Sequence, residues 1–362
     1  MSCSTLAEME RKQVRRHALR RIVAATGPPW ELVLAAGLVL AMMLALSVGK
    51  YPVAIGEIPR FFLASLGLCD MAADRYAALA NVIIDIRLPR VLSAVLVGSA
   101  LASSGAAFQA VFRNPLVSPG LLGVLSGASF GAALGIVLGV SWYVVQSLAF
   151  VMGLGAVVFG VAVARLFGNA ATLTLVLGGM VSGALFASLL SITKYIADPM
   201  NALPNIVYWL MGNLAQSNLH QIAWLTIPMF GGVLLLGVLG RALDALAMGD
   251  DEARSLGVPV GVIRFAVIAT ATLISSLTVS IAGMIGWIGL IVPHIVRLAL
   301  GASNTRLMPS SALFGAMFLL GADYLARTLA DTEIPIGIVT ELLGIPIFLL
   351  VLSRTSRGWN ER

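Results

Sequence analysis

The segment from Ile86 to Gly123 constrains this chain more than any other, because it combines a membrane-span pattern with clear signals for where the span ends. It opens with IRLPR (86–90), continues as a long apolar run, and breaks at Asn114-Pro115 before a second apolar run begins behind Ser118-Pro119. Small side chains fill its centre: Gly98, Ser99, Ala100, Ala102, Ser103, Ser104, Gly105, Ala106 and Ala107. In lipid, small residues let helix backbones approach closely. The segment therefore predicts a helix that packs against other helices and not only against lipid.

The composition places the whole chain in the class of polytopic membrane proteins. Of its 362 residues, 59% are hydrophobic and only 11% are charged, and the mean hydropathy is +0.96. A soluble protein of this length does not have such a composition, and no polar stretch is long enough to bury a core of its own. The formal charge of +6 does not indicate nucleic-acid binding, because six basic residues crowd the N-terminus before the first apolar run, as in a cytoplasmic flank.

Ten apolar runs are long enough to be read as membrane spans. We expect an all-α protein with a basic cytoplasmic tail (1–30), a transmembrane domain (31–353) and a cytoplasmic C-terminal tail (354–362). Both termini lie inside in this topology, which places most of the 23 Lys and Arg residues on the inside as well. The predicted spans are 31–48, 88–109, 119–139, 144–166, 172–193, 221–240, 262–283, 284–300, 308–326 and 335–353. Gly283 and Gly286 mark where the nearly continuous apolar stretch 262–300 divides into two spans. The outer segments 50–86 and 194–220 are each expected to hold a short surface helix.

The inside loop 241–261 contains the sequence MGDDEARSLGVPVG (248–261). Acidic residues in a first turn and a glycine after the last turn are typical of a short capped helix. From the residues alone, this helix is either part of an ordinary solvated loop or a docking helix for a soluble partner.

Arginines gather at the predicted outer ends of two spans. Arg87 and Arg90 begin the second span, and Arg327 ends the ninth, four residues after Asp323, with which it can pair on one helix face. Such arginines either extend towards the membrane surface or form a cationic rim for a partner outside the membrane. Glu341 lies within the last span and has no evident partner, so a proton-relay role stays open for it.

The sequence lacks the motifs for ATP hydrolysis, metal binding and enzyme catalysis. The phosphate-binding pattern G-x-x-x-x-G-K-[ST] is absent, so this chain has no ATPase site of that kind. Its three histidines and two cysteines do not come together in the spacing of metal ligands, and we expect no metal site. Without a clustered nucleophile or paired carboxylates, a membrane-embedded enzyme is improbable.

Six blocks in order resemble the FecCD-type permeases of ABC importers for iron-siderophores, haem and vitamin B12. They are IRLPR (86–90), GSALASSGAAFQAVFRNPLVSPGLLG (98–123), GDDEARSLGV (249–258), GWIGLIVPHIVR (286–297), GADYLAR (321–327) and EIPIGIVTELLGIPIFLL (333–350). The resemblance implies the type II ABC importer permease fold with ten transmembrane helices. It also implies a second copy or a sister permease, two ABC ATPase subunits that carry ATP and Mg, and a substrate-binding protein on the outer face.

The same resemblance implies roles for particular residues. Arg87, Arg90 and Arg327 match arginines that meet glutamates of the binding protein. The segment Asp250, Asp251, Glu252, Ala253, Arg254, Leu256 and Gly257 matches the coupling helix that seats in the ATPase. Asn114 and Leu116 match a cytoplasmic gate, and Thr172 matches a second gate position. Glu341 departs from the family, which usually has a small or neutral residue there.

We therefore expect a permease subunit of the bacterial inner membrane that imports a bulky metal chelate and binds no cofactor itself. Small-residue content places the pathway along the second, fifth and eighth-to-tenth spans, with Ser103, Ser104 and Ser188 as candidate lining residues. An iron-siderophore is the expected cargo, with haem, cobalamin or an oxyanion as alternatives. An ion-coupled secondary transporter is the alternative from another class, and Glu341 would be its coupling residue.

Overall fold

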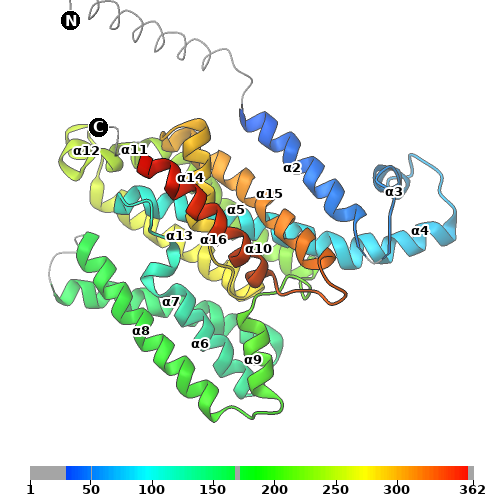
Figure 1. Cartoon of the computed structure of the whole chain (residues 1–362), viewed down its shortest axis with the longest axis horizontal. Coiled ribbons are helices and arrows are strands. Elements are labelled where there is room, and N and C mark those ends of the chain that lie inside the picture. The colour runs from blue at the N-terminus through cyan, green and yellow to red at the C-terminus, as the bar shows by residue number, and fades with distance from the viewer. Residues whose placement is uncertain (1–29, 50, 168–171, 358–362) are drawn as a thin grey trace, which may run out of the picture.

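The computed structural model of the chain describes residues 30–49, 51–167 and 172–357, with side chains up to residue 350 and without that of Thr172. The predicted N-terminal tail therefore lies almost entirely outside the described residues. The described residues form helices joined by turns (Figure 1). In order these are α2 (Trp30–Ser47), α3 (Glu57–Ser65), α4 (Ala73–Ala80), the π-helix η1 (Asn81–Arg87), α5 (Leu88–Phe112), the 3-10 helix η2 (Pro119–Leu122), α6 (Val124–Val137), α7 (Trp142–Leu166), α8 (Thr172–Ile196), α9 (Ala202–Leu210), α10 (Leu219–Val238), α11 (Gly240–Met248), α12 (Asp250–Ser255), α13 (Val260–Ala282), α14 (Ile288–Leu300), α15 (Asn304–Thr328) and α16 (Ile336–Arg357).

Each of the ten predicted spans coincides with one of these helices: α2, α5, α6, α7, α8, α10, α13, α14, α15 and α16. Within the part of the chain that the structure describes, six helical segments are long and apolar enough to cross a bilayer by length and composition alone, whereas α6, α14 and the apolar part of α16 are shorter. The third predicted span is shorter than expected because its start forms η2 and ends at Gly123, whose φ is +85°. The last helix continues to Arg357, past the predicted boundary at residue 353.

Helix α5 lies at the centre of the larger group of helices and packs against α10, α13, α14 and α15. Its small residues make this possible. A Cβ on Gly98 would lie 2.3 Å from the carbonyl oxygen of Gly315, and one on Gly105 would lie 1.8 Å from that of Gly289. The helix backbones therefore touch directly at both places. This confirms the prediction that the segment is built to pack against other helices.

Helices α6 to α9 form a second group beside the first, in the lower part of Figure 1. Close backbone contacts recur here. A Cβ on Gly131 of α6 would lie 2.3 Å from the oxygen of Leu148 on α7, and one on Gly178 of α8 would lie 2.2 Å from that of Gly160 on α7. The short helix α9 is the one expected within the outer loop 194–220.

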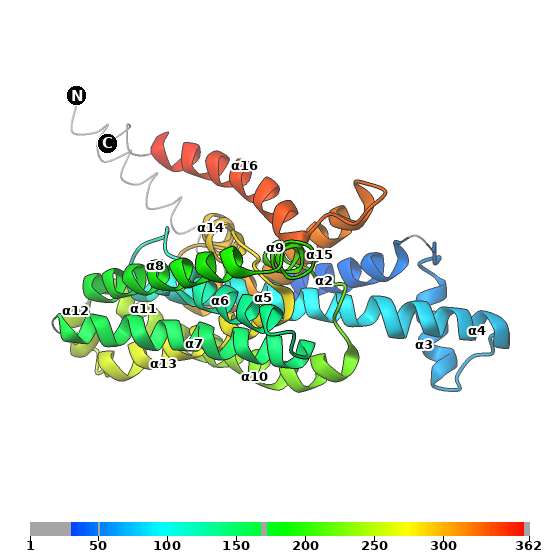
Figure 2. The same ribbon diagram turned by 90° about the horizontal axis from the view of Figure 1, so that it is seen from below.

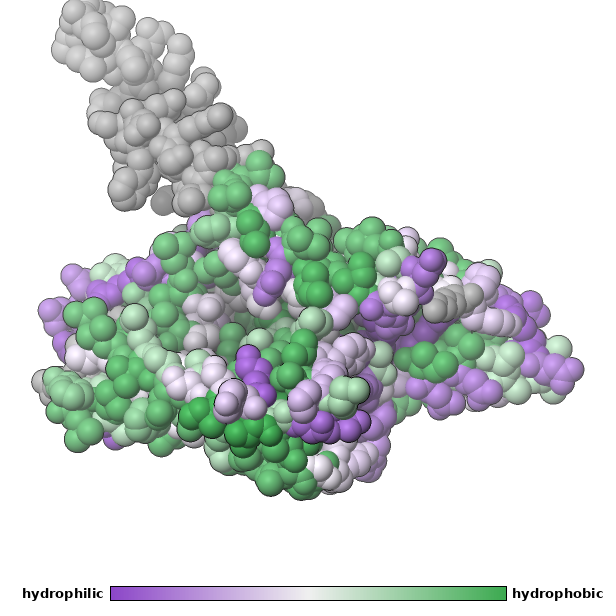
Figure 3. Space-filling model, turned by 60° about the horizontal axis from the view of Figure 1, so that its bottom comes forward, coloured by the Kyte–Doolittle hydropathy of each residue, from purple (hydrophilic) through white to green (hydrophobic). Residues whose placement is uncertain are grey.

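The predicted outer segment 50–86 forms two short helices, and the second is continuous with α5. Together α4, η1 and α5 make one helical run of 40 residues, Ala73–Phe112. At about 1.5 Å per residue this run is roughly 60 Å long, about twice the thickness of the hydrocarbon core. It extends beyond the bundle at one end (Figure 2), where Arg75 of α4 forms an ion pair of 2.7 Å with Glu57 of α3. Hydrophilic residues gather at this end in Figure 3, and hydrophobic and hydrophilic patches are mixed in the middle of the face shown.

The apolar stretch 262–300 divides where two glycines predict a break. Helix α13 ends at Ala282 and α14 begins at Ile288. Gly283 has φ +69°, and a Cβ there would lie 2.4 Å from the carbonyl oxygen of Trp209. Only glycine accommodates this combination of backbone angle and close approach. Trp287, which precedes α14, also has a positive φ of 69°, which is strained for a side chain of its size.

Candidate functional site

The inside loop contains the short helix that its sequence predicts. Helix α12 begins directly after Gly249, whose φ is +140°, and has three acidic residues in its first turn. Gly257 follows with φ +78°, and its N–H donates to the carbonyl oxygen of Arg254. Ala253 is fully buried, while Leu256 is 63% exposed. One face of α12 is therefore seated on the bundle, and the other is free to meet a partner.

The two aspartates at the start of α12 have different surroundings. One Arg264 nitrogen on α13 donates to both carboxylate oxygens of Asp250, at 2.7 and 2.9 Å, and Arg113 at the end of α5 lies 3.9 Å away. The hydrogen bond from Arg264 lowers the pKa of Asp250, and the charges of Arg264, Arg113 and Arg254 add to this effect. The Asp251 side chain is 94% exposed and pairs with Arg254 on the same helix at 2.8 Å.

The turn after α5, which contains the predicted gate residues, is held by its own hydrogen bonds. Arg113 has the left-handed φ of 50° that ends the helix. The side-chain oxygen of Asn114 accepts from the N–H of Leu116 at 2.9 Å, and Leu116 is 58% exposed. One turn earlier, Gln109 donates to the carbonyl oxygen of Leu290 at 3.2 Å and accepts from Arg297 at 3.0 Å, both in α14. Thr172 begins α8, and its side chain lies outside the described residues.

A cavity of about 240 Å³ lies between α5, η2, α13 and the start of α14. Its wall includes Leu101, Pro119 and Trp287 together with the hydroxyl-bearing residues Ser118 and Ser275. The hydroxyl of Ser275 is buried and has no hydrogen-bond partner among the described residues. The chain thus leaves a small, largely apolar space beside η2, and neither Asn114 nor Leu116 lines it.

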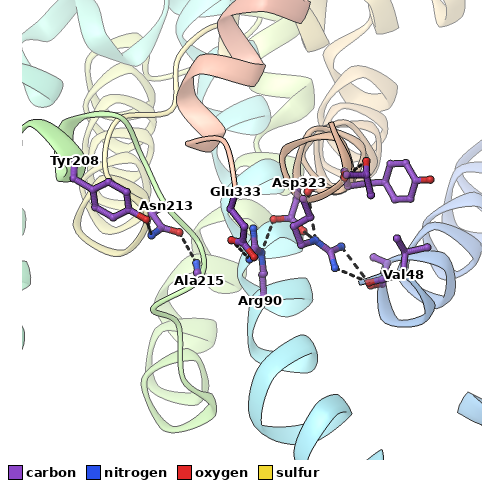
Figure 4. A network of polar contacts seen from close by, with 11 residues as sticks. Val48, Arg90, Tyr208, Asn213, Ala215, Asp323 and Glu333 are labelled. Atoms are coloured by element: carbon purple, nitrogen blue, oxygen red, sulfur yellow. Dashed lines mark hydrogen bonds and ion pairs between the residues drawn. The ribbon is translucent and has the colours of Figure 1, made fainter. Parts of the chain in front are cut away.

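At the opposite end, the three predicted docking arginines make contacts within the protein, and Figure 4 shows those of Arg90. Arg90 donates to Asp323 at 2.7 Å and to Glu333 at 2.8 Å, so it joins α5 to α15 and to the segment before α16. Arg327 lies 3.0 Å from the second oxygen of Asp323, which confirms the pair expected from their spacing. The Asp323 side chain is fully buried between the two arginines.

Arg87 and Arg327 also bind the C-terminal end of α2. Arg87 donates to the carbonyl oxygens of Leu46 at 2.6 Å and Ser47 at 2.9 Å, and also to that of Tyr51. Arg327 donates to the carbonyl oxygen of Val48 at 2.8 Å. Carbonyl groups at a helix C-terminus have no partner within the helix, so the guanidinium groups satisfy them. Arg87 is 5% exposed, so docking of a binding protein on this side chain would require its present contacts to break. Docking through the three arginines stays a prediction.

The three serines predicted to line a pathway are not together. Ser103 and Ser104 are buried in the core of the larger group, where the Ser104 hydroxyl donates to the carbonyl oxygen of Ala271 on α13. In this chain α5 turns both serines towards neighbouring helices, and their role in a pathway stays a prediction. Ser188 is exposed on α8, and its hydroxyl donates to the Ala184 carbonyl oxygen within the same helix.

Sequence reasoning missed the partners that complete both charged sites. Arg264 and Glu333 had no assigned role, although each carries a charge near a span end, which is a usable signal. Asp244 of α11 was also missed. It accepts from the N–H of Asn304 at 2.6 Å and from its side chain at 3.0 Å, and so caps the start of α15. Within the described residues there is no group of three or more His, Cys, Asp or Glu side chains that could hold a metal ion.

Comparisons with known proteins match this arrangement. The model of the FecCD transport family matches residues 37–354. The chain is 36% identical over 321 residues to the molybdate import system permease protein MolB of Haemophilus influenzae, covering 89% of this chain and 94% of that one. It is 39% identical over 285 residues to a "Probable iron chelatin transport system permease protein" of Helicobacter pylori, covering 78% and 85%. A solved structure assigned to the metal-chelate type of ABC transporter, in an inward-facing conformation, superposes with a TM-score of 0.80 at 35% identity, covering 90% of this chain and 99% of that one.

The helical fold and these matches define the membrane-spanning permease class of ABC importers. The chain belongs to the FecCD transport family and is a multi-pass protein of the bacterial inner membrane. As a permease subunit it is not itself the ATPase, and it works with ATPase and binding-protein partners. Family membership decides in favour of the ABC importer over the ion-coupled transporter that the sequence left open.

Proposed function

We propose that this permease carries a bulky iron chelate, in the first place an iron-siderophore, from a binding protein on the outer face to the cytoplasm. It does so with a second copy of itself or a sister permease, and two ATPase subunits bind ATP and Mg for the complex. The chain itself binds no cofactor in this proposal. Haem and cobalamin are the alternative cargoes of the same general kind.

The observation that carries the choice of cargo is the character of the exposed faces of α8 and α16. Helix α16 packs mainly against α14 and α15 and leaves its other face open (Figure 2). Its exposed residues include Ile338, Leu342 and Ile345, and those of α8 include Leu177 and Val181. Neither helix has a cationic side chain in residues 173–193 or 336–350. Apolar and weakly polar walls suit a large chelate that presents an organic surface.

Glu341 argues against a small oxyanion as cargo. It lies on the exposed side of α16, with apolar neighbours on the same helix. A carboxylate facing lipid is costly, so this face is expected to meet a second subunit or a water-filled path. Negative charge in such a path repels a dianion such as molybdate, which is the cargo named for one relative.

Uptake into proteoliposomes tests the proposal. The permease is reconstituted with its ATPase subunits and binding protein, and radiolabelled ferric siderophore, haem, cobalamin and molybdate are offered in parallel. We expect ATP-dependent accumulation of the ferric siderophore and none of molybdate. Accumulation of molybdate would overturn the cargo assignment, and uptake that needs no ATPase subunits would overturn the importer mechanism.

A further inference from the structure

We infer that Asp250 connects the helix α12 to the turn that ends α5, so that a displacement of α12 by the ATPase moves the predicted gate. This inference rests on the proposed function, because it assigns a role to a residue within that import cycle. Asp250 acts here as a positioning residue that transmits movement, and it does not form part of the surface that meets the ATPase.

The first step is the orientation of the Asp250 side chain. It is 28% exposed, and its carboxylate is directed to Arg264 of α13, whose side chain is 16% exposed. Its neighbour Asp251 is 94% exposed. Two adjacent aspartates of one short helix therefore have different surroundings. Asp251 is available to a partner, while Asp250 is committed to the transmembrane bundle.

The second step is the contact with the end of α5. Arg113 lies 3.9 Å from the same Asp250 oxygen that binds Arg264, and its side chain is 45% exposed. A single carboxylate thus lies between an arginine of α13 and an arginine of α5, which are 151 positions apart in the chain. Because two cations close together repel each other, removing the carboxylate charge is expected to drive Arg113 away from Arg264.

The third step is the stiffness of the turn that Arg113 begins. The N–H of Asn114 donates to the carbonyl oxygen of Gln109 at 3.2 Å, and the N–H of Leu116 donates to the Asn114 side chain. The first bond ties Asn114 to the last turn of α5, and the second ties Leu116 to Asn114. A displacement of Arg113 is therefore passed on to Leu116 without being absorbed by a flexible segment.

Two variants separate this role from simple support of α12. Asp250→Asn removes the shared charge, and Arg113→Gln removes only the contact with α5 and leaves Arg264 in place. Both are expected to assemble with the ATPase and hydrolyse ATP. Substrate transported per ATP is expected to fall by about fivefold or more, the lower end of typical couplings between distant sites. Arg306→Gln, an exposed arginine at the start of α15, is the control for loss of charge and is expected to keep the wild-type ratio.

Asp251→Asn provides a contrast on the same helix. If Asp251 faces the ATPase, this variant weakens the binding of the ATPase subunits but keeps the wild-type ratio of transport to hydrolysis once they are saturating. The opposite distribution, with the ratio lost in Asp251→Asn and kept in Asp250→Asn, would overturn the inference.

A second measurement follows the gate itself. Leu116→Cys is placed in a background with Cys3→Ser and Cys69→Ser, and its reaction with a water-soluble maleimide is timed with and without ATP plus vanadate. We expect the rate to respond to nucleotide with Asp250 present and not with Asp250→Asn. Two outcomes would overturn this inference and leave the proposed function standing. One is an equal response to nucleotide in both backgrounds. The other is an Arg113→Gln variant that couples normally while Asp250→Asn fails to bind the ATPase. If no ATPase associates with the wild type, the proposed function fails first.

Discussion

The two charged sites of this permease are built from the same residue types but differ in how far water reaches them. At the predicted outer end, the side chains of Asp323, Arg327 and Arg90 are 0%, 8% and 11% exposed. At the inner end, those of Arg264, Asp250 and Arg113 are 16%, 28% and 45% exposed. Desolvated charges depend on each other strongly, whereas partly hydrated ones can separate at low cost.

This difference indicates different uses. The outer network joins α2, α5, α15 and the segment before α16, and it holds them at one end of the bundle. The inner network joins a short helix to two spans through one carboxylate. The outer site is suited to keep helices together, and the inner site is suited to change its contacts during a cycle. The predictions below test this contrast, beginning with the largest effect.

Asp323→Asn should be the most damaging single change. It leaves Arg90 and Arg327 buried without their shared counter-charge, and breaking a buried pair in this way costs about 3–5 kcal/mol. Thermal unfolding of the purified protein in detergent measures the loss. Asp251→Asn, which removes an exposed carboxylate, should change the unfolding free energy by less than about 0.5 kcal/mol. Equal midpoints for the two variants would show that the outer network is not structural.

Gly105→Ala tests the helix that the two sites share. The added Cβ would lie 1.8 Å from a carbonyl oxygen of Gly289, so α5 and α14 must move apart, at a cost of about 1–3 kcal/mol. Gly155→Ala is the matched control, because a Cβ there meets nothing within 4 Å. It should be neutral or slightly stabilising, since alanine favours helix over glycine. Loss of stability in the control alone would contradict this packing.

Glu333→Gln opens the outer network at its hydrated edge. The Glu333 side chain is 47% exposed, and Arg90 keeps Asp323 as a partner, so the loss should stay below about 1 kcal/mol. Asp331→Asn, another exposed carboxylate two residues away, is the control for loss of charge. A loss as large as that of Asp323→Asn would mean that Glu333, and not Asp323, holds the arginines.

The inner ion pair should not respond to pH in the physiological range. Arg264 lowers the pKa of Asp250, so the contribution of this carboxylate to stability is present above its unfolded pKa. That contribution is lost only as the pH falls through the lowered folded pKa. Transport per ATP is measured at constant salt between about pH 6 and pH 8. The wild type should show no pH-dependent transition in this range that is missing from Asp250→Asn. A transition of that kind would mean that another group titrates with the coupling.

Much of the fold followed from the sequence. Apolar length located the ten long segments, and small residues between Gly98 and Ala107 predicted the close packing of α5. The acidic run before Ala253 predicted the short helix α12, and Gly283 predicted the break before α14. These features are local, since they depend on residues within a few turns of each other.

The direction of each charged side chain was decided only by tertiary structure. Arg87 is an outer arginine by sequence, yet it is buried because the end of α2, about forty positions earlier, offers it two carbonyl oxygens and Tyr51 offers a third. Asp250 and Asp251 are equivalent by sequence, and only the position of Arg264 and Arg113 separates them. Sequence determined which segments enter the membrane, because burial of apolar length is a local property. Helix packing determined which charged side chains stay exposed to a partner protein, because a buried charge must pair with a group that the packing brings close to it.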